Sequence, residues 1–245
     1  MRRWTARYRF GWTPVISFDR RRSELLDWVE SNLNPVSFRD SEGQVGLALR
    51  KGVRIVISRH GATIEDTVAA SDGVASVLPV LEGLIDVMEP RDIVLADGSI
   101  GWSVDMNVTD YEAATHSLAT RLSGVSESLP SGARAKDIAT LMDFEGIDYK
   151  VQTEFGIVSP RELQERLMES KVGKLMGRPA GRVRPQLFET LPPTSLFVDT
   201  YFEESRTTKL QSVPEIIAAI ARVDSAAEEV AVAVSQSVSE KENII

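Results

Sequence analysis

Residues 3–12 read RWTARYRFGW and carry the clearest strand pattern in the chain. Aromatic residues occupy even positions, at Trp4, Tyr8, Phe10 and Trp12, and mostly arginine, threonine or glycine stands between them. Alternation with a period of two is typical of a strand that buries one of its faces. The stretch therefore predicts a strand with one aromatic face and one basic face.

Further strand signals follow along the chain. Three short segments rich in β-branched or aromatic residues are separated by turn residues, which predicts an antiparallel meander: 36–39, 45–49 and 53–58. An Asp-Gly pair at positions 97–98 stands between two more apolar segments. Because Asp-Gly suits the tight turns of hairpins, the pair predicts a hairpin there.

Helices are indicated by apolar residues at helical spacing and by capping signals. The spacing predicts amphipathic helices over 23–33, 74–88 and 110–122. Two capping boxes, one from Ser159 to Glu162 and one from Ser212 to Glu215, predict two further helix starts. The second begins a long C-terminal helix.

A small, polar and turn-rich stretch at 123–132, SGVSESLPSG, is the best linker candidate. It divides the chain into two similar-sized halves, 1–125 and 126–245, each with strand, helix, strand and helix in that order. This recurrence has two alternative explanations: a distant internal duplication, or chance repetition of a common order of elements. We therefore expect an α+β fold in which each half is a mainly antiparallel sheet with helices packed on one face.

Composition excludes several classes of function. The chain of 245 residues is 42% hydrophobic and 26% charged, which is typical of a folded globular protein. It contains no Cys and two His, so disulfides, thiolate zinc sites, cysteine nucleophiles and multi-histidine metal sites are excluded. We expect no cofactor and no metal. Neither a secretory signal nor a membrane-spanning stretch is evident, so we expect a cytoplasmic protein without membrane contact.

The net charge of −8 conceals two basic segments. Residues 1–22 hold seven Arg and one Asp, and residues 171–184 hold five basic residues and no acid. Together these segments predict a surface for an anionic partner, formed by Arg7, Arg9, Lys174, Arg178, Arg182 and Arg184. The alternatives are that these residues pair with the surplus acids or lie in a solvated loop.

Ser58-Arg59-His60-Gly61 closes a predicted strand and resembles the strand-end Arg-His-Gly signature of the histidine phosphatase and phosphoglycerate mutase superfamily. The resemblance implies that His60 attacks phosphorus and that Arg59 binds the phosphate. About six residues carry it. The only other histidine, His116, lies inside a predicted helix rather than at a strand end.

No complete catalytic set is present, which favours a non-enzymatic binding or assembly protein. A bacterial accessory, defence or immunity-type factor fits this description. It would engage a protein or anionic partner through the basic surface, or associate with itself through the alanine-rich C-terminal helix. Two alternatives stay open: a phosphate-handling enzyme that uses Arg59 and His60, and a nucleic-acid or nucleotide binder that uses the basic segments.

Overall fold

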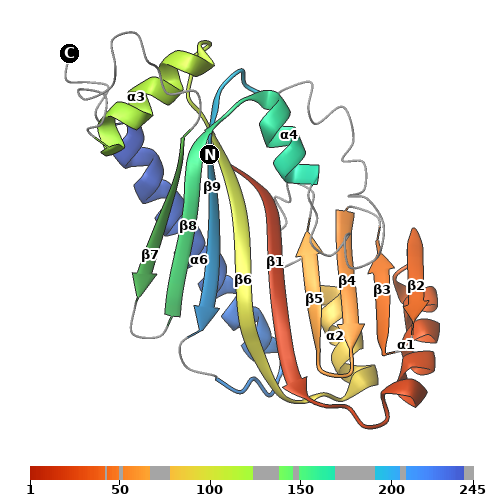
Figure 1. Ribbon diagram of the computed structural model, residues 1–245. Coiled ribbons are helices and arrows are strands. Elements are labelled where there is room, and N and C mark those ends of the chain that lie inside the picture. Colours follow the sequence, from red (N-terminus) through yellow and green to blue (C-terminus); the bar gives the residue numbers. More distant parts are fainter. Residues whose placement is uncertain are drawn as a thin grey trace.

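The computed structural model describes residues 1–41, 43–49, 52–66, 78–123, 138–145, 149–168, 191–204 and 208–239. Its strands form one nine-stranded sheet in the order β2-β3-β4-β5-β1-β6-β9-β8-β7, and every neighbouring pair is antiparallel. Figure 1 shows the sheet as a broad twisted surface, with β2 at one edge and β7 at the other.

The strands are β1 (Arg2–Thr13), β2 (Ser37–Ser41), β3 (Gln44–Ala48), β4 (Val53–Ser58), β5 (Gly61–Asp66), β6 (Arg91–Asp105), β7 (Ala139–Glu145), β8 (Tyr149–Val158) and β9 (Ser195–Glu204). The helices are α1 (Phe18–Asn32), α2 (Leu78–Met88), α3 (Tyr111–Ser123), α4 (Pro160–Met168) and α6 (Val213–Ser239). The predicted meander is present as β2, β3 and β4, and the first predicted capping box begins α4, where the Ser159 amide donates to Oε2 of Glu162 at 2.8 Å.

The predicted hairpin at Asp97-Gly98 is wrong, because β6 runs without a break through this pair. Both residues lie between β1 and β9 in the middle of the sheet. Asp97 is buried and faces Arg9, while Gly98 leaves room for α6, since a Cβ there would lie 3.0 Å from Cγ1 of Val223. Tertiary contacts on both faces therefore override the local turn signal.

One face of the sheet carries the main hydrophobic core. Figure 1 shows α1 and α2 behind the β2 to β5 end and α6 crossing behind the other strands. Alanines at Ala219, Ala227 and Ala231 are fully buried on α6, and such small side chains let the helix backbone approach β6 and β9 closely. The predicted long C-terminal helix is thus present and packs on its own sheet.

The other face of the sheet, which we call the open face, is covered at one end by α4. Leu163 of α4 packs there in a separate small cluster with Trp4, Val158 and Phe197. Trp4 reaches this face because the pairing of β1 with β6 shifts by one residue between Arg3 and Thr5. Since a one-residue shift reverses which face a side chain points to, Trp4 leaves the aromatic face predicted for it and Arg3 takes its place.

The α+β class and the antiparallel sheet are confirmed, and helices lie on both faces. Strands from the two predicted halves belong to one sheet, because β6 pairs with β9. The predicted boundary at 125–126 lies outside the described residues, and the duplication stays a prediction.

None of the described helices combines the length and the apolar character that a membrane crossing requires.

Candidate functional site

Arg59 and His60 are the central residues of the turn between β4 and β5. Their backbone carbonyls hold the chain where it leaves β1: the Arg59 oxygen accepts from the Val15 amide and from Nε1 of Trp12, both at 3.0 Å, and the His60 oxygen accepts from the Trp12 amide at 3.0 Å. The side chain of Arg59 pairs with Asp19 at 3.6 Å. The backbone of this turn therefore has a structural role, because it anchors the segment that follows β1.

The second histidine lies in a different part of the molecule. His116 belongs to α3, and Figure 1 places α3 at the opposite corner from the turn between β4 and β5. The described structure therefore does not bring His60 and His116 into one phosphate site. Among the residues with described positions, no group of three or more His, Asp or Glu is arranged to hold a metal ion.

Arg7 and Arg9 point to the open face from β1, as the alternation predicts, and both pair with Asp97 of β6. Nη2 of Arg7 lies 3.4 Å from Oδ1 of Asp97, whose side chain is 2% exposed, while the Arg9 side chain is 57% exposed. A buried carboxylate thus offsets much of their positive charge. The remaining predicted basic residues lie outside the described part of the chain: Lys174, Arg178, Arg182 and Arg184.

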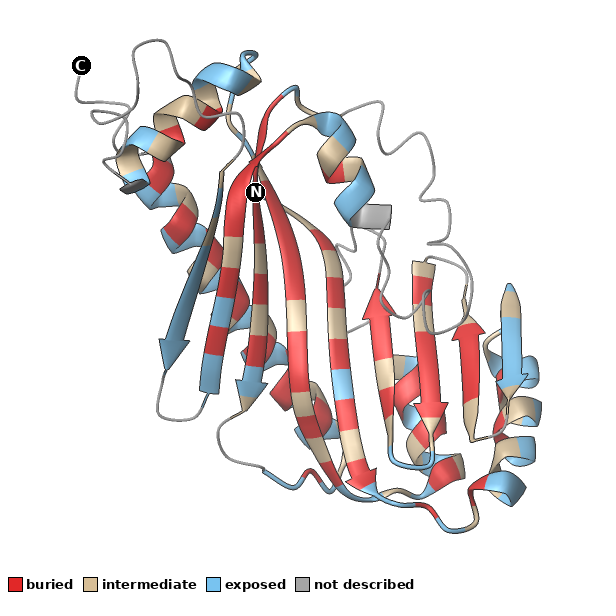
Figure 2. Cartoon of the chain, viewed as in Figure 1, coloured by how far each residue is buried: buried red, intermediate tan, exposed pale blue. Residues whose placement is uncertain are grey.

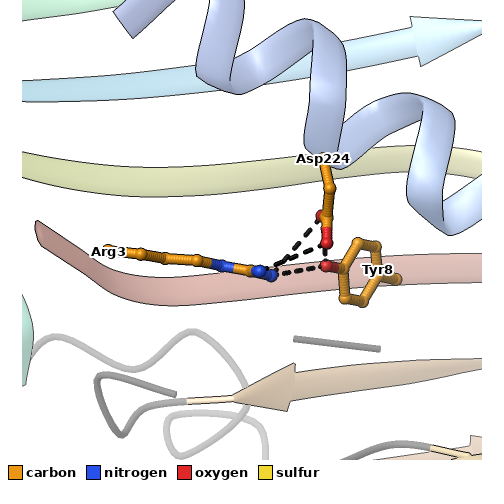
Figure 3. Close-up of polar contacts among 3 residues, drawn as sticks. All are labelled: Arg3, Tyr8 and Asp224. Atoms are coloured by element: carbon orange, nitrogen blue, oxygen red, sulfur yellow. Dashed lines mark hydrogen bonds and ion pairs between the residues drawn. The ribbon is translucent and has the colours of Figure 1, made fainter. Parts of the chain in front are cut away.

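A buried polar cluster that the sequence analysis missed joins β1 to α6 (Figure 3). Nη2 of Arg3 donates to the Tyr8 hydroxyl at 2.7 Å, and the Tyr8 hydroxyl donates to Oδ1 of Asp224. Nη1 of Arg3 donates to Oδ2 of Asp224 at 3.2 Å. The available signal was the position of Asp224, a carboxylate directly after the buried Val223 in the apolar stripe of a helix.

Burial governs the protonation of this cluster. It raises the pKa of Tyr8 far above the ordinary value, and the adjacent Asp224 carboxylate adds to that rise. The hydroxyl therefore stays protonated and donates a hydrogen bond to Asp224. Burial also raises the pKa of Asp224, and the charge of Arg3 and the hydrogen bond from Tyr8 oppose this. With Tyr8 only 1% exposed, the cluster is a structural connection rather than a reactive site.

The most exposed part of the sheet is its edge strand β7, whose only described neighbour is β8. Six of its seven residues are exposed, and Figure 2 shows the strand exposed along most of its length beside largely buried neighbours. Leu141 is 60% exposed, Met142 39% and Phe144 44%. Large apolar side chains that water reaches on a sheet edge mark a contact surface.

The two faces of β7 differ in chemistry. Phe144 pairs with Val151 of β8, and Val151 pairs with Phe202 of β9. Both of these residues are buried in the core beside α6, so Phe144 and Met142 point to the face that α6 covers. Asp143 pairs with Gln152 of β8, which pairs with Tyr201 of β9, and these three residues point to the open face. Leu141 and Glu145 alternate with Met142 and Phe144 along β7, so they point to the open face as well. One face of the edge is apolar, and the other is mainly acidic.

A hollow of about 420 Å³ adjoins β7 at the β7-β8-β9 end of the sheet. Its charged lining residues are Asp143, Glu145, Glu203 and Lys150. Asp143 accepts a hydrogen bond from Nε2 of Gln152 at 3.0 Å, which fixes its carboxylate in position. Three acids against one lysine give the hollow a negative balance. The sequence did not predict that these residues share one hollow, because three separate strands contribute them.

No family model matches the chain, and no curated protein is significantly similar to it. A functional interpretation therefore depends on the geometry of the chain itself.

Proposed function

We propose that the chain is a non-enzymatic protein-binding or assembly module, and that β7 is the strand that receives an extended segment of a protein partner. The observation that carries the proposal is a regular seven-residue edge strand with large apolar side chains exposed on both of its faces. Strand addition is a recurrent mode of peptide recognition, in which main-chain hydrogen bonds supply affinity and alternate side chains supply specificity.

The contrast between the two edges of the sheet supports this choice of strand. Proteins protect edge strands from unwanted pairing by keeping them short or by placing charges, Lys or Pro on them. The edge strand β2 has five residues and carries Arg39 and Asp40 in its middle. β7 is longer, contains neither Lys nor Pro, and pairs with β8 without a bulge. Its two charges, Asp143 and Glu145, both point to the open face, so the other side of this edge carries no charge. Such an edge is costly to leave open unless a partner uses it.

The two other functions considered from the sequence have weaker structural support. The Arg59-His60 turn is held through its backbone, with His116 elsewhere, which does not favour phosphate chemistry. The pairing of Arg7 and Arg9 with a buried Asp97 does not favour a strong anionic site on the open face. An anionic partner therefore remains a proposal for the segment around Lys174 to Arg184.

The test is a titration of the isotope-labelled full chain with a short capped peptide that alternates Val and Thr, a strand-forming sequence without charge. We expect chemical-shift changes and slowed amide exchange in β7, because a paired strand protects the amides that it bonds. Replacing Leu141 and Phe144 together with Lys should abolish the changes.

Val232→Lys on α6 is the matched control, since Val232 is also a surface residue, 37% exposed, and lies off the edge. It should leave the titration unchanged. If β7 amides do not respond to any strand-forming peptide, the proposed function is wrong.

A further inference from the structure

The side chains around the exposed edge indicate which side chains a partner strand should carry. A strand added beside β7 presents alternate side chains to the two faces of the sheet. Those on the α6 side would lie beside Met142 and Phe144, and those on the open side beside Leu141, Asp143 and Glu145. Each set meets a surface of different chemistry, so the two surfaces together specify an alternating partner.

On the open side the edge continues into the negative hollow. Glu203 lies across β8 from Asp143 and Glu145, and all three carboxylates line the same space. In the described part of the chain, none of the three forms an ion pair, since Lys150, which also lines the hollow, is not in salt-bridge contact with them. Burial raises the pKa of the neighbouring Tyr201, and the negative charges of Asp97 and Glu203 add to this rise. The hollow therefore has carboxylates available to a cation.

On the α6 side the surface is apolar and aromatic. Met142 and Phe144 are joined by Tyr149 of β8, which is 44% exposed and whose ring lies 6.1 Å from that of Phe202. Removing these apolar side chains from water lowers the free energy most when the covering group is itself apolar. A partner side chain on this face gains most if it is apolar.

We infer that the partner segment is a strand that alternates basic and apolar residues, with Lys or Arg side chains directed to the hollow lined by Asp143, Glu145 and Glu203. This inference rests on the proposed function of β7. Opposite charges that face each other across paired strands stabilise the pairing, and like charges destabilise it. A long basic side chain reaches over the edge and keeps its apolar stem against Leu141.

Charge also argues against a second copy of this chain as the occupant. A copy of β7 would bring its own Asp143 and Glu145 to an edge that is already acidic, between two molecules of net charge −8 each. Complementary charge instead selects a basic partner and speeds its encounter.

The experiment compares two capped peptides on the isotope-labelled full chain, one alternating Val and Lys and one alternating Val and Glu. With the Lys peptide we expect chemical-shift changes and slowed amide exchange at β7. We also expect the Lys peptide to bind at least about tenfold more tightly than the Glu peptide at low salt. The difference should shrink as salt is added, because exposed charges are screened.

Asp143→Asn with Glu145→Gln should weaken binding of the Lys peptide several-fold. The matched control, Glu228→Gln with Glu229→Gln, removes the same charge from exposed positions on α6 and should have little effect. An equal loss in both variants would attribute the preference to net charge and overturn the assignment to the hollow.

The remaining outcomes separate the inference from the proposed function. If both peptides bind β7 equally well, the partner chemistry is wrong while β7 remains a docking strand. If sedimentation reveals a dimer that Leu141→Lys converts to a monomer, the occupant is a second copy and the inference is overturned. If β7 responds to none of the peptides and the chain is monomeric, the proposed function itself fails.

Discussion

The indole ring of Trp28 on α1 occupies the space beside Gly83 on α2 that a larger residue would need. An ideal Cβ built on Gly83 lies 1.9 Å from Cζ2 of Trp28. Glycine inside a helix costs about 1 kcal/mol relative to alanine, so helix propensity alone would favour alanine here. The close packing of the two helices explains why glycine is suitable at this position.

Gly83→Ala should therefore destabilise the protein by about 1–3 kcal/mol, because the ring and the helices must shift to admit the methyl group. Gly11→Ala is the control, since a Cβ there meets only Cγ2 of Val94 at 3.5 Å, an ordinary contact distance. Urea unfolding measures both. A Gly83→Ala protein as stable as the wild type would contradict this packing.

The buried Asp224 should make stability depend on pH in a specific direction. Burial raises its pKa in the folded state above the ordinary 3.8, so the folded protein holds this proton more tightly than the unfolded chain. The stabilisation is fully present below the unfolded pKa and is lost as pH rises through the folded pKa. Wild type should thus lose stability relative to Asp224→Asn as pH rises from about 4.

Urea unfolding of both proteins across this pH range provides the measurement. The control is Glu229→Gln, an exposed carboxylate on α6, which should not change the pH profile; Glu228 is unsuitable, because its negative charge adds to the rise in the Asp224 pKa. A stability difference that stays constant, or that grows in favour of the wild type as pH rises, would contradict the raised pKa.

The hydrogen bond between Trp4 and Ser103 should link the end of β1 to β6. Nε1 of Trp4 donates to Oγ of Ser103 at 2.6 Å, and both residues are buried on the open face. Trp4→Phe and Ser103→Ala should each destabilise the protein. A double-mutant cycle should give a coupling of about 1 kcal/mol, the typical net value of such a bond. Coupling near zero would mean that the two side chains do not interact.

Trp4 also illustrates how far the sequence predicts the fold. The alternation in residues 3–12 correctly predicts a strand and places Tyr8, Phe10 and Trp12 on the core face. It misplaces Trp4 and Arg3, because the one-residue shift against β6 depends on pairing between positions about a hundred residues apart. Local periodicity contains no information about such a shift.

The candidate site was harder to predict for the same reason. The position of β7 at the edge of the sheet follows from the order of the described strands, which short-range patterns do not specify. The hollow combines side chains from β7, β8 and β9, and β9 begins at Ser195, more than thirty positions after the end of β8. Asp143 and Glu203, which are sixty positions apart in the sequence, therefore become neighbours only through the topology.

Asp97 should be more important to stability than exposed acids that also form ion pairs. Its side chain is 2% exposed between Arg7 and Arg9, so Asp97→Asn would leave two cations without their shared partner. Breaking a fully buried pair costs about 3–5 kcal/mol, and because water reaches Arg9 we expect a smaller loss here, about 1–3 kcal/mol. Asp92→Asn removes an exposed pair with Lys209 and should change little. Equal urea midpoints for the two variants would mean that the ion pairs of Asp97 do not stabilise the protein more than an exposed pair does.

His60 should be dispensable for both stability and catalysis. Its hydrogen bonds come from the backbone: the oxygen accepts from the Trp12 amide and the amide donates to Oγ of Ser58, and His60→Ala retains both atoms. We expect wild type and His60→Ala to unfold at the same urea concentration and to hydrolyse p-nitrophenyl phosphate at equal, negligible rates. Trp12→Phe, which removes the donor to the Arg59 oxygen, should instead cost about 1 kcal/mol. Measurable hydrolysis by the wild type that is lost in His60→Ala would restore the phosphate-handling alternative, because only a side-chain role for His60 explains that result.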